Sequence, residues 1–137
     1  MKKILVCSHG NLSKGICESL KIISGPQENV DYITCYNDDI DPKEKIKRYL
    51  DNNKDVQIIA LSDVFGGSVN QLLMMYANNN PNIKLITGFN FPLLIELALN
   101  DSDKISDEEL EMIIENSRKQ IMLVSEIKEE LVDDFDF

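Results

Sequence analysis

The sequence of 137 residues has one histidine, three cysteines and no long apolar run. No stretch approaches the roughly 20 apolar residues that a membrane-spanning helix needs. Polar residues 8–10 interrupt the apolar start too early for a signal peptide, so we expect a cytoplasmic protein. Cys7, Cys17 and Cys35 are odd in number and lack metal-ligand spacing, which favours small buried thiols over a redox or metal site.

Basic residues are also few. The chain has 14 Lys and Arg against 24 Asp and Glu, a formal net charge of −10, which argues against nucleic-acid binding and suits a basic protein partner. A single histidine with scattered carboxylates predicts no metal site. The sequence has no Gly-Lys-Ser/Thr phosphate loop, no GxGxxG after its first strand and no GxSxG elbow, so neither a nucleotide cofactor nor a serine hydrolase is indicated.

What the sequence does contain is a regular alternation of strands and helices. Apolar and β-branched runs predict strands at residues 3–7, 30–36, 55–61 and 83–87, each followed by residues at helical spacing. The pattern predicts one α/β domain over residues 1–137, with an acidic, solvated tail at about 128–137. We expect a doubly wound, mostly parallel sheet of order 2-1-3-4 with helices on both faces.

Helix starts and ends differ in how clearly they are marked. Asp41 before Pro42, Ser68 with Gln71, and Ser106 with Glu109 each predict a capped helix N-terminus. The helix over residues 93–99 is apolar nearly all round, which predicts burial or a subunit contact. Residues 121–124 fit either a continued helix or a late strand.

Two strand ends carry the candidate chemistry. The first strand ends in Ser8-His9-Gly10, and the third ends in Asp63 followed by Gly66-Gly67-Ser68. In the 2-1-3-4 order both loops open on the same crevice. Asp63 could then accept a hydrogen bond from one nitrogen of His9, which leaves the other nitrogen unprotonated and nucleophilic. The glycines and the helix start at Ser68 would favour an anion.

A histidine nucleophile, an orienting carboxylate and an anion cradle together predict phosphoryl transfer through phosphohistidine. Because no nucleotide site is present, the phosphoryl group would come from another phosphoprotein. A solvated surface histidine is the simpler interpretation of His9 taken alone, and a flavodoxin-like binder of a small ligand with an inert His9 is a competing hypothesis.

Three sequence blocks resemble one known family, the IIA components of mannose-type sugar phosphotransferase systems. The blocks are Lys3-Ile4-Leu5-Val6-Cys7-Ser8-His9-Gly10, Ser62-Asp63-Val64-Phe65-Gly66-Gly67-Ser68 and Gly88-Phe89-Asn90-Phe91-Pro92-Leu93-Leu94. They occur in the family's order and at consistent spacing, and the resemblance covers roughly residues 1 to 125.

The resemblance implies a phosphotransferase that carries a phosphoryl group between proteins. His9 would accept it on Nε2 from phosphorylated HPr and pass it to a IIB component during sugar uptake. Asp63 would hold Nδ1, and Gly66, Gly67 and Ser68 would line the phosphoryl pocket. The resemblance implies no metal or cofactor, and contact with the membrane only through the transporter subunits.

The family is typically a homodimer in which a late antiparallel strand crosses between subunits, and residues 121–127 lie where that strand would be. Many members continue into a IIB domain, whereas this sequence has an acidic tail at that place. The resemblance therefore implies that IIB is a separate polypeptide here. A stand-alone regulatory phosphoacceptor domain would use the same His9 chemistry. The phosphocarrier subunit of dihydroxyacetone kinase is less similar, because it has an Asp-Asp-Gly loop that this sequence lacks.

Overall fold

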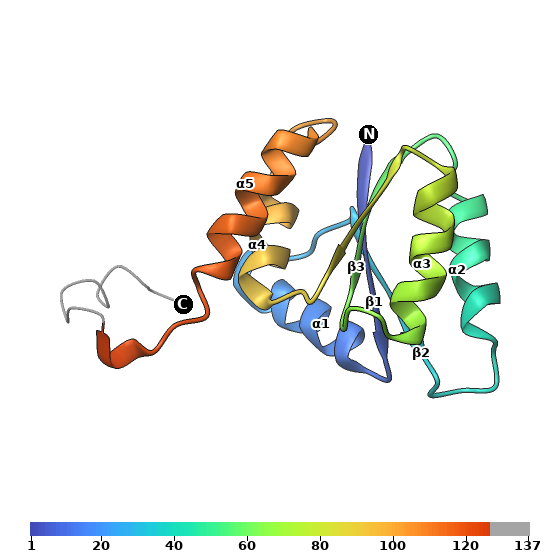
Figure 1. Ribbon diagram of the computed structural model, residues 1–137, viewed down its shortest axis with the longest axis horizontal. Coiled ribbons are helices and arrows are strands. Elements are labelled where there is room, and N and C mark those ends of the chain that lie inside the picture. The colour runs from blue at the N-terminus through green and yellow to red at the C-terminus, as the bar shows by residue number, and fades with distance from the viewer. Residues whose placement is uncertain (127–137) are drawn as a thin grey trace.

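The computed structural model describes residues 1–126 and is built on a four-stranded parallel sheet (Figure 1). Its strands are β1 (Lys2–His9), β2 (Val30–Cys35), β3 (Gln57–Ser62) and β4 (Ile83–Thr87). They are ordered β2-β1-β3-β4 and every pairing is parallel, which confirms the predicted fold class and strand order.

Helices cover both faces of this sheet (Figure 1). The first face packs against α1 (Leu12–Ser24) and α4 (Phe91–Leu99), with α5 (Asp107–Arg118) lying on α4. The second face packs against α2 (Pro42–Asp51) and α3 (Ser68–Asn79). None of these described helices is long and apolar enough to cross a membrane.

The two central strands, β1 and β3, are buried on both faces because their side chains alternate between two hydrophobic clusters. Ile4 and Leu61 point toward α1 and α4, whereas Leu5 and Ala60 point toward α2 and α3. All four are fully buried. The carboxyl ends of these two strands are therefore fixed on a rigid base, and these ends carry His9 and Asp63.

Two of the three predicted helix caps are present. The Asp41 side chain accepts a hydrogen bond from the Lys43 N–H, and Ser106 accepts one from the Glu109 N–H. The predicted cap formed by Ser68 and Gln71 is wrong. Gly67 is the N-cap of α3, and the Ser68 hydroxyl turns toward His9 and Tyr36 instead. The Gln71 side chain donates to the Gly66 carbonyl.

One face of α4 is buried in the core through Leu93, Leu94, Leu97 and Ala98, so the predicted burial is confirmed for that face, whereas Leu99 is 59% exposed. After it, α5 ends at Arg118, so residues 121–124 do not continue the helix. Residues Val124–Glu126 form one 3₁₀ turn, and residues 121–126 form no strand within this chain. The predicted acidic tail lies outside the described residues, and so does the last position of the predicted exchanged strand.

Candidate functional site

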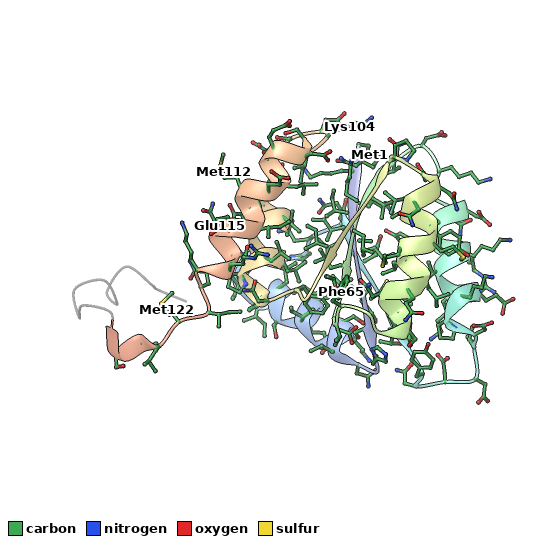
Figure 2. All side chains as sticks on the ribbon, in the orientation of Figure 1. Met1, Phe65, Lys104, Met112, Glu115 and Met122 are labelled. Carbon is green, nitrogen blue, oxygen red and sulfur yellow. The ribbon has the colours of Figure 1, made fainter. Side chains whose placement is uncertain are left out.

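His9 and Asp63 lie side by side because their strands are neighbours. His9 is the last residue of β1, and Asp63 follows the last residue of β3. The two strands pair in parallel, with Cys7 opposite Ser62, so both residues emerge at the same edge of the sheet. Figure 2 labels Phe65 in the loop that follows Asp63, toward the opposite end of the sheet from Met1. The structure thus brings the two residues together at one edge of the sheet, as the strand order requires.

The Asp63 carboxylate holds His9 by two hydrogen bonds. Its Oδ2 atom lies 2.9 Å from the His9 ring nitrogen Nδ1 and also accepts the His9 backbone N–H at 2.9 Å. Its Oδ1 atom accepts the Val64 backbone N–H at 3.1 Å. Only 7% of the Asp63 side chain is exposed, against 44% of the His9 side chain. The carboxylate is therefore shielded while the imidazole faces solvent.

These contacts keep Asp63 ionised. Burial on its own raises the pKa of Asp63, but the hydrogen bonds from the His9 backbone and ring, with the charge of the imidazole, bring the pKa below its ordinary value of 3.8. An ionised carboxylate only accepts hydrogen bonds, so a neutral His9 carries its proton on Nδ1. The Nε2 atom then holds the lone pair and is the ring nitrogen that could act as a nucleophile.

The loop between β3 and α3 surrounds the Nε2 side of the ring. The Ser68 hydroxyl lies 3.3 Å from Nε2. A Cβ added at Gly67 would stand 3.3 Å from His9 Cε1, so any other residue here would require the imidazole to shift by a few tenths of an ångström. Gly66 has φ +79°, a left-handed conformation that favours glycine. All five residues predicted from the sequence, His9, Asp63, Gly66, Gly67 and Ser68, thus belong to one site.

Helix α3 points its N-terminus at this site. Among the described residues no side chain caps it, so the N–H groups of its first turn have no partner within the helix. Such a helix end attracts anions through these N–H groups and its positive dipole end. A nucleophilic imidazole nitrogen beside an anion-binding helix end is suited to accept a phosphoryl group.

Tyr36 is a site residue that the sequence pattern did not indicate. It was expected inside the second strand, but β2 ends at Cys35, and Tyr36 has φ +65°, in the left-handed region. Its ring stacks on the His9 imidazole with centroids 5.4 Å apart and an interplanar angle of 21°. Its hydroxyl donates to Ser68 Oγ at 2.8 Å. The sequence signal for this turn was the polar run Asn37-Asp38-Asp39 that follows.

The three cysteines are not candidate nucleophiles. Cys7, Cys17 and Cys35 are all buried, as predicted. Burial raises the pKa of each thiol above the ordinary value of 9.0, well above it for Cys7 and to about 11 for Cys17. Within residues 1–126, no group of three His, Cys, Asp or Glu side chains is arranged to hold a metal ion.

A groove of about 760 Å³ lies between α4 and α5, and none of the site residues lines it. Its walls are mostly apolar and include Phe91, Ile95, Leu99 and Met112. Figure 2 shows Met112 on the outer side of α5. None of the residues that line the groove is a histidine, so it does not share the chemistry of the His9 site.

Comparison with known proteins assigns the chain to a family. The sequence profile of the family described as "PTS system fructose IIA component" matches residues 3–114, a span that includes all the residues of the site described above. The chain belongs to this family. It is a IIA component of the mannose-type phosphotransferase system (PTS), and the resemblance found in the sequence is confirmed.

Curated relatives of this IIA component include the mannose-specific EIIAB component of Escherichia coli (strain K12). The two are 28% identical over 129 residues, an alignment that covers 86% of this chain and 38% of the relative. The chain therefore spans well under half the length of the curated relatives it matches.

Solved structures agree on the fold. The phosphotransferase system component EIIA from Streptococcus agalactiae superposes with a TM-score of 0.81 at 26% identity, covering 93% of this chain and 100% of that one. The PTS IIA protein associated with the fucose utilization operon of Streptococcus pneumoniae gives a TM-score of 0.77 at 28% identity, covering 90% of this chain and 93% of that one.

Proposed function

We propose that this IIA component accepts a phosphoryl group on Nε2 of His9 from phosphorylated HPr and passes it to a IIB component. The observation that carries the proposal is the 2.9 Å contact between Nδ1 and the Asp63 carboxylate, which leaves the lone pair on the exposed nitrogen. The α3 N-terminus beside it supports the roles proposed for Gly66, Gly67 and Ser68.

The transfer balances without a metal or an added base. The bond between phosphorus and the nitrogen of the donor histidine breaks, and the bond between phosphorus and Nε2 of His9 forms. The donor nitrogen leaves with the electron pair of the broken bond. Because Nδ1 keeps its proton on the Asp63 side, Nε2 loses no proton on attack, and Asp63 stabilises the positive charge that the ring gains. In the second transfer a nucleophilic atom of IIB forms the new bond to phosphorus, the bond between phosphorus and Nε2 breaks, and its electron pair returns to Nε2 of a neutral His9.

Labelling tests the proposal. Incubation with enzyme I, HPr and labelled phosphoenolpyruvate should give a phosphorylated chain whose label is labile to acid and stable to base, and a IIB component added afterwards should remove that label. His9→Ala should take up none. Equal labelling of wild type and His9→Ala would contradict the proposal, and so would label that IIB cannot remove.

We also propose that residues 1–137 act as a single cytoplasmic IIA domain and as a homodimer with a second copy of the chain. Ile121, Leu123 and Val124 are 78%, 68% and 63% exposed, an unusual apolar run for a free surface. Strand β4 pairs only with β3 in the described part of the chain, so its other edge is open to a further strand. Both features favour a partner copy here.

Sedimentation tests the dimer. Wild type at micromolar concentration should sediment at twice the chain mass, and Leu123→Asp should shift it to the monomer. Ile22→Asp is the matched control, because Ile22 on α1 is 87% exposed and lies outside this surface. A monomeric wild type would contradict the proposal.

A further inference from the structure

Tyr36 occupies a position that its backbone conformation disfavours. At φ +65° a residue with a side chain is strained, and Asn, Asp or Gly are the residues usually found there. Strain of this kind concentrates at functional sites, where the surrounding structure holds it in place. The residue is also about half exposed, so core packing does not explain a tyrosine here. Its side chain therefore needs a different explanation.

The backbone around Tyr36 is fixed on both sides. The Gly10 N–H donates to the carbonyl of Cys35, the residue before it, at 2.7 Å. On the other side, the Asn37 side chain donates to the Asn11 side chain at 2.8 Å. Both ties lead to the loop that directly follows His9. The turn is thus held against the segment that carries the nucleophile, which places the Tyr36 ring against the imidazole.

The Tyr36 hydroxyl sets the direction of a chain of hydrogen bonds. It donates to Ser68 Oγ at 2.8 Å, and Ser68 Oγ lies 3.3 Å from Nε2 of His9. A serine hydroxyl has one proton. When Oγ accepts from Tyr36, that proton is available for Nε2, whose lone pair is fixed by the contact of Nδ1 with Asp63.

We propose that Tyr36 is a positioning residue for phosphoryl transfer, which acts through Ser68 by holding the Ser68 hydroxyl as a hydrogen-bond donor at Nε2 of His9. A phosphoryl group that bonds to Nε2 arrives where this hydroxyl points, so the proton of Ser68 then serves a phosphoryl oxygen. Donation from Tyr36 also polarises the Ser68 hydroxyl and strengthens it as a donor. This inference rests on the proposed phosphorylation of His9.

The test combines Tyr36→Phe, Ser68→Ala and the double variant. Tyr36→Phe keeps the ring on His9 and removes only the hydroxyl. We expect phosphorylation by phosphorylated HPr to slow about three- to tenfold, the effect of losing one neutral hydrogen bond. The double variant should be no slower than Ser68→Ala, because Tyr36 acts through Ser68. Tyr32→Phe is the control, since Tyr32 is an exposed tyrosine of β2 outside this site and should react like wild type.

A second measurement does not depend on phosphorylation. In ¹⁵N NMR at a pH where His9 is neutral, Tyr36→Phe should move the Nε2 resonance toward that of an imidazole nitrogen whose lone pair accepts no hydrogen bond. The Nδ1 resonance should stay in place, because Asp63 is untouched. A purely structural role for Tyr36 would not move one ring nitrogen alone.

The two measurements separate the possible failures. If wild type takes up no phosphate but the Nε2 resonance shifts as expected, the proposed function fails and the hydrogen-bond chain stands. If wild type is phosphorylated and Tyr36→Phe matches it in rate or in Nε2 resonance, the role of Tyr36 is overturned. Additive losses in the double variant would also overturn it, since two residues acting through one hydroxyl cannot contribute independently.

Discussion

Replacing Asp63 by asparagine removes a negative charge at one of the shortest contacts of the site. In the native chain Oδ2 accepts two N–H groups of His9 and Oδ1 accepts the Val64 N–H. Asparagine has one oxygen for these three donors. If that oxygen takes the Oδ2 position, only the Val64 N–H loses its acceptor, whereas the opposite orientation sets the amide against both His9 donors. The first orientation therefore prevails, and Nδ1 keeps its proton.

The expected loss follows from that geometry. The tautomer of His9 is kept, so Asp63→Asn loses the charge of the hydrogen bond to Nδ1 but not the bond itself. A hydrogen bond to a charged group contributes about 1.5–3 kcal/mol and one between neutral groups about 0.5–1.5 kcal/mol, so the loss is the difference, about 1–1.5 kcal/mol. At about 1.4 kcal/mol for each factor of ten in rate, this corresponds to phosphorylation slowed about 5- to 12-fold. Asp63→Leu, which removes every acceptor, should be slower still.

Rapid-quench labelling with phosphorylated HPr measures this rate directly. Asp51→Asn is the control, because Asp51 forms an exposed ion pair with Lys47 at the end of α2 and should react at the wild-type rate. An Asp63→Asn rate within twofold of wild type would refute the role of the carboxylate. A loss as complete as that of His9→Ala would show that the tautomer, and not only the charge, had been lost.

Three further predictions concern the loop, the thiols and the core. Gly67→Ala should slow phosphorylation several-fold at unchanged stability, because the added Cβ displaces His9 Cε1. Gly66→Ala should instead lower the free energy of unfolding by about 1 kcal/mol, because alanine is strained at φ +79°. A thermal melt of each variant, run beside the labelling assay, distinguishes the two effects. The pKa of Cys17 is raised from 9.0 to about 11 by burial, so its contribution to stability is complete below pH 9 and lost as the pH rises toward 11. The free energy of unfolding measured in urea should therefore fall from pH 8 to pH 10, and it should fall by less in Cys17→Ala. Leu97→Ala should destabilise the fold by about 2–5 kcal/mol in the same assay, because Leu97 is fully buried; a loss under 1 kcal/mol would contradict its place in the core.

The sheet and its order could be predicted because the determining signals are local. Four short apolar runs separated by residues at helical spacing leave little choice of fold class, and right-handed crossovers restrict the strand order. The pairing of His9 with Asp63 then followed from two strand ends that had to be neighbours. The two residues are 54 positions apart in sequence, but their contact could still be predicted because the sheet brings the two strand ends together.

Tyr36 could not be predicted because its role depends on a non-local contact. By composition it continues the β-branched and aromatic run of the second strand. The polar run Asn37-Asp38-Asp39 indicates a nearby turn, but not that the tyrosine before it adopts a left-handed conformation. Ser68 shows the same limit. A serine three residues before glutamine at a helix start predicts a cap, but the nearby imidazole and phenol compete for its hydroxyl. The N-cap position then passes to Gly67.

The position of the phosphoryl group on the phosphorylated protein tests the central claim most directly. In combined ³¹P and ¹⁵N NMR, the phosphorus should couple directly to Nε2 of His9, while Nδ1 retains its proton next to Asp63. Coupling to Nδ1 would contradict the account, because that nitrogen lies 2.9 Å from the carboxylate oxygen and has no room for a phosphoryl group. A phosphate found on Ser68 or on any residue other than His9 would contradict it equally.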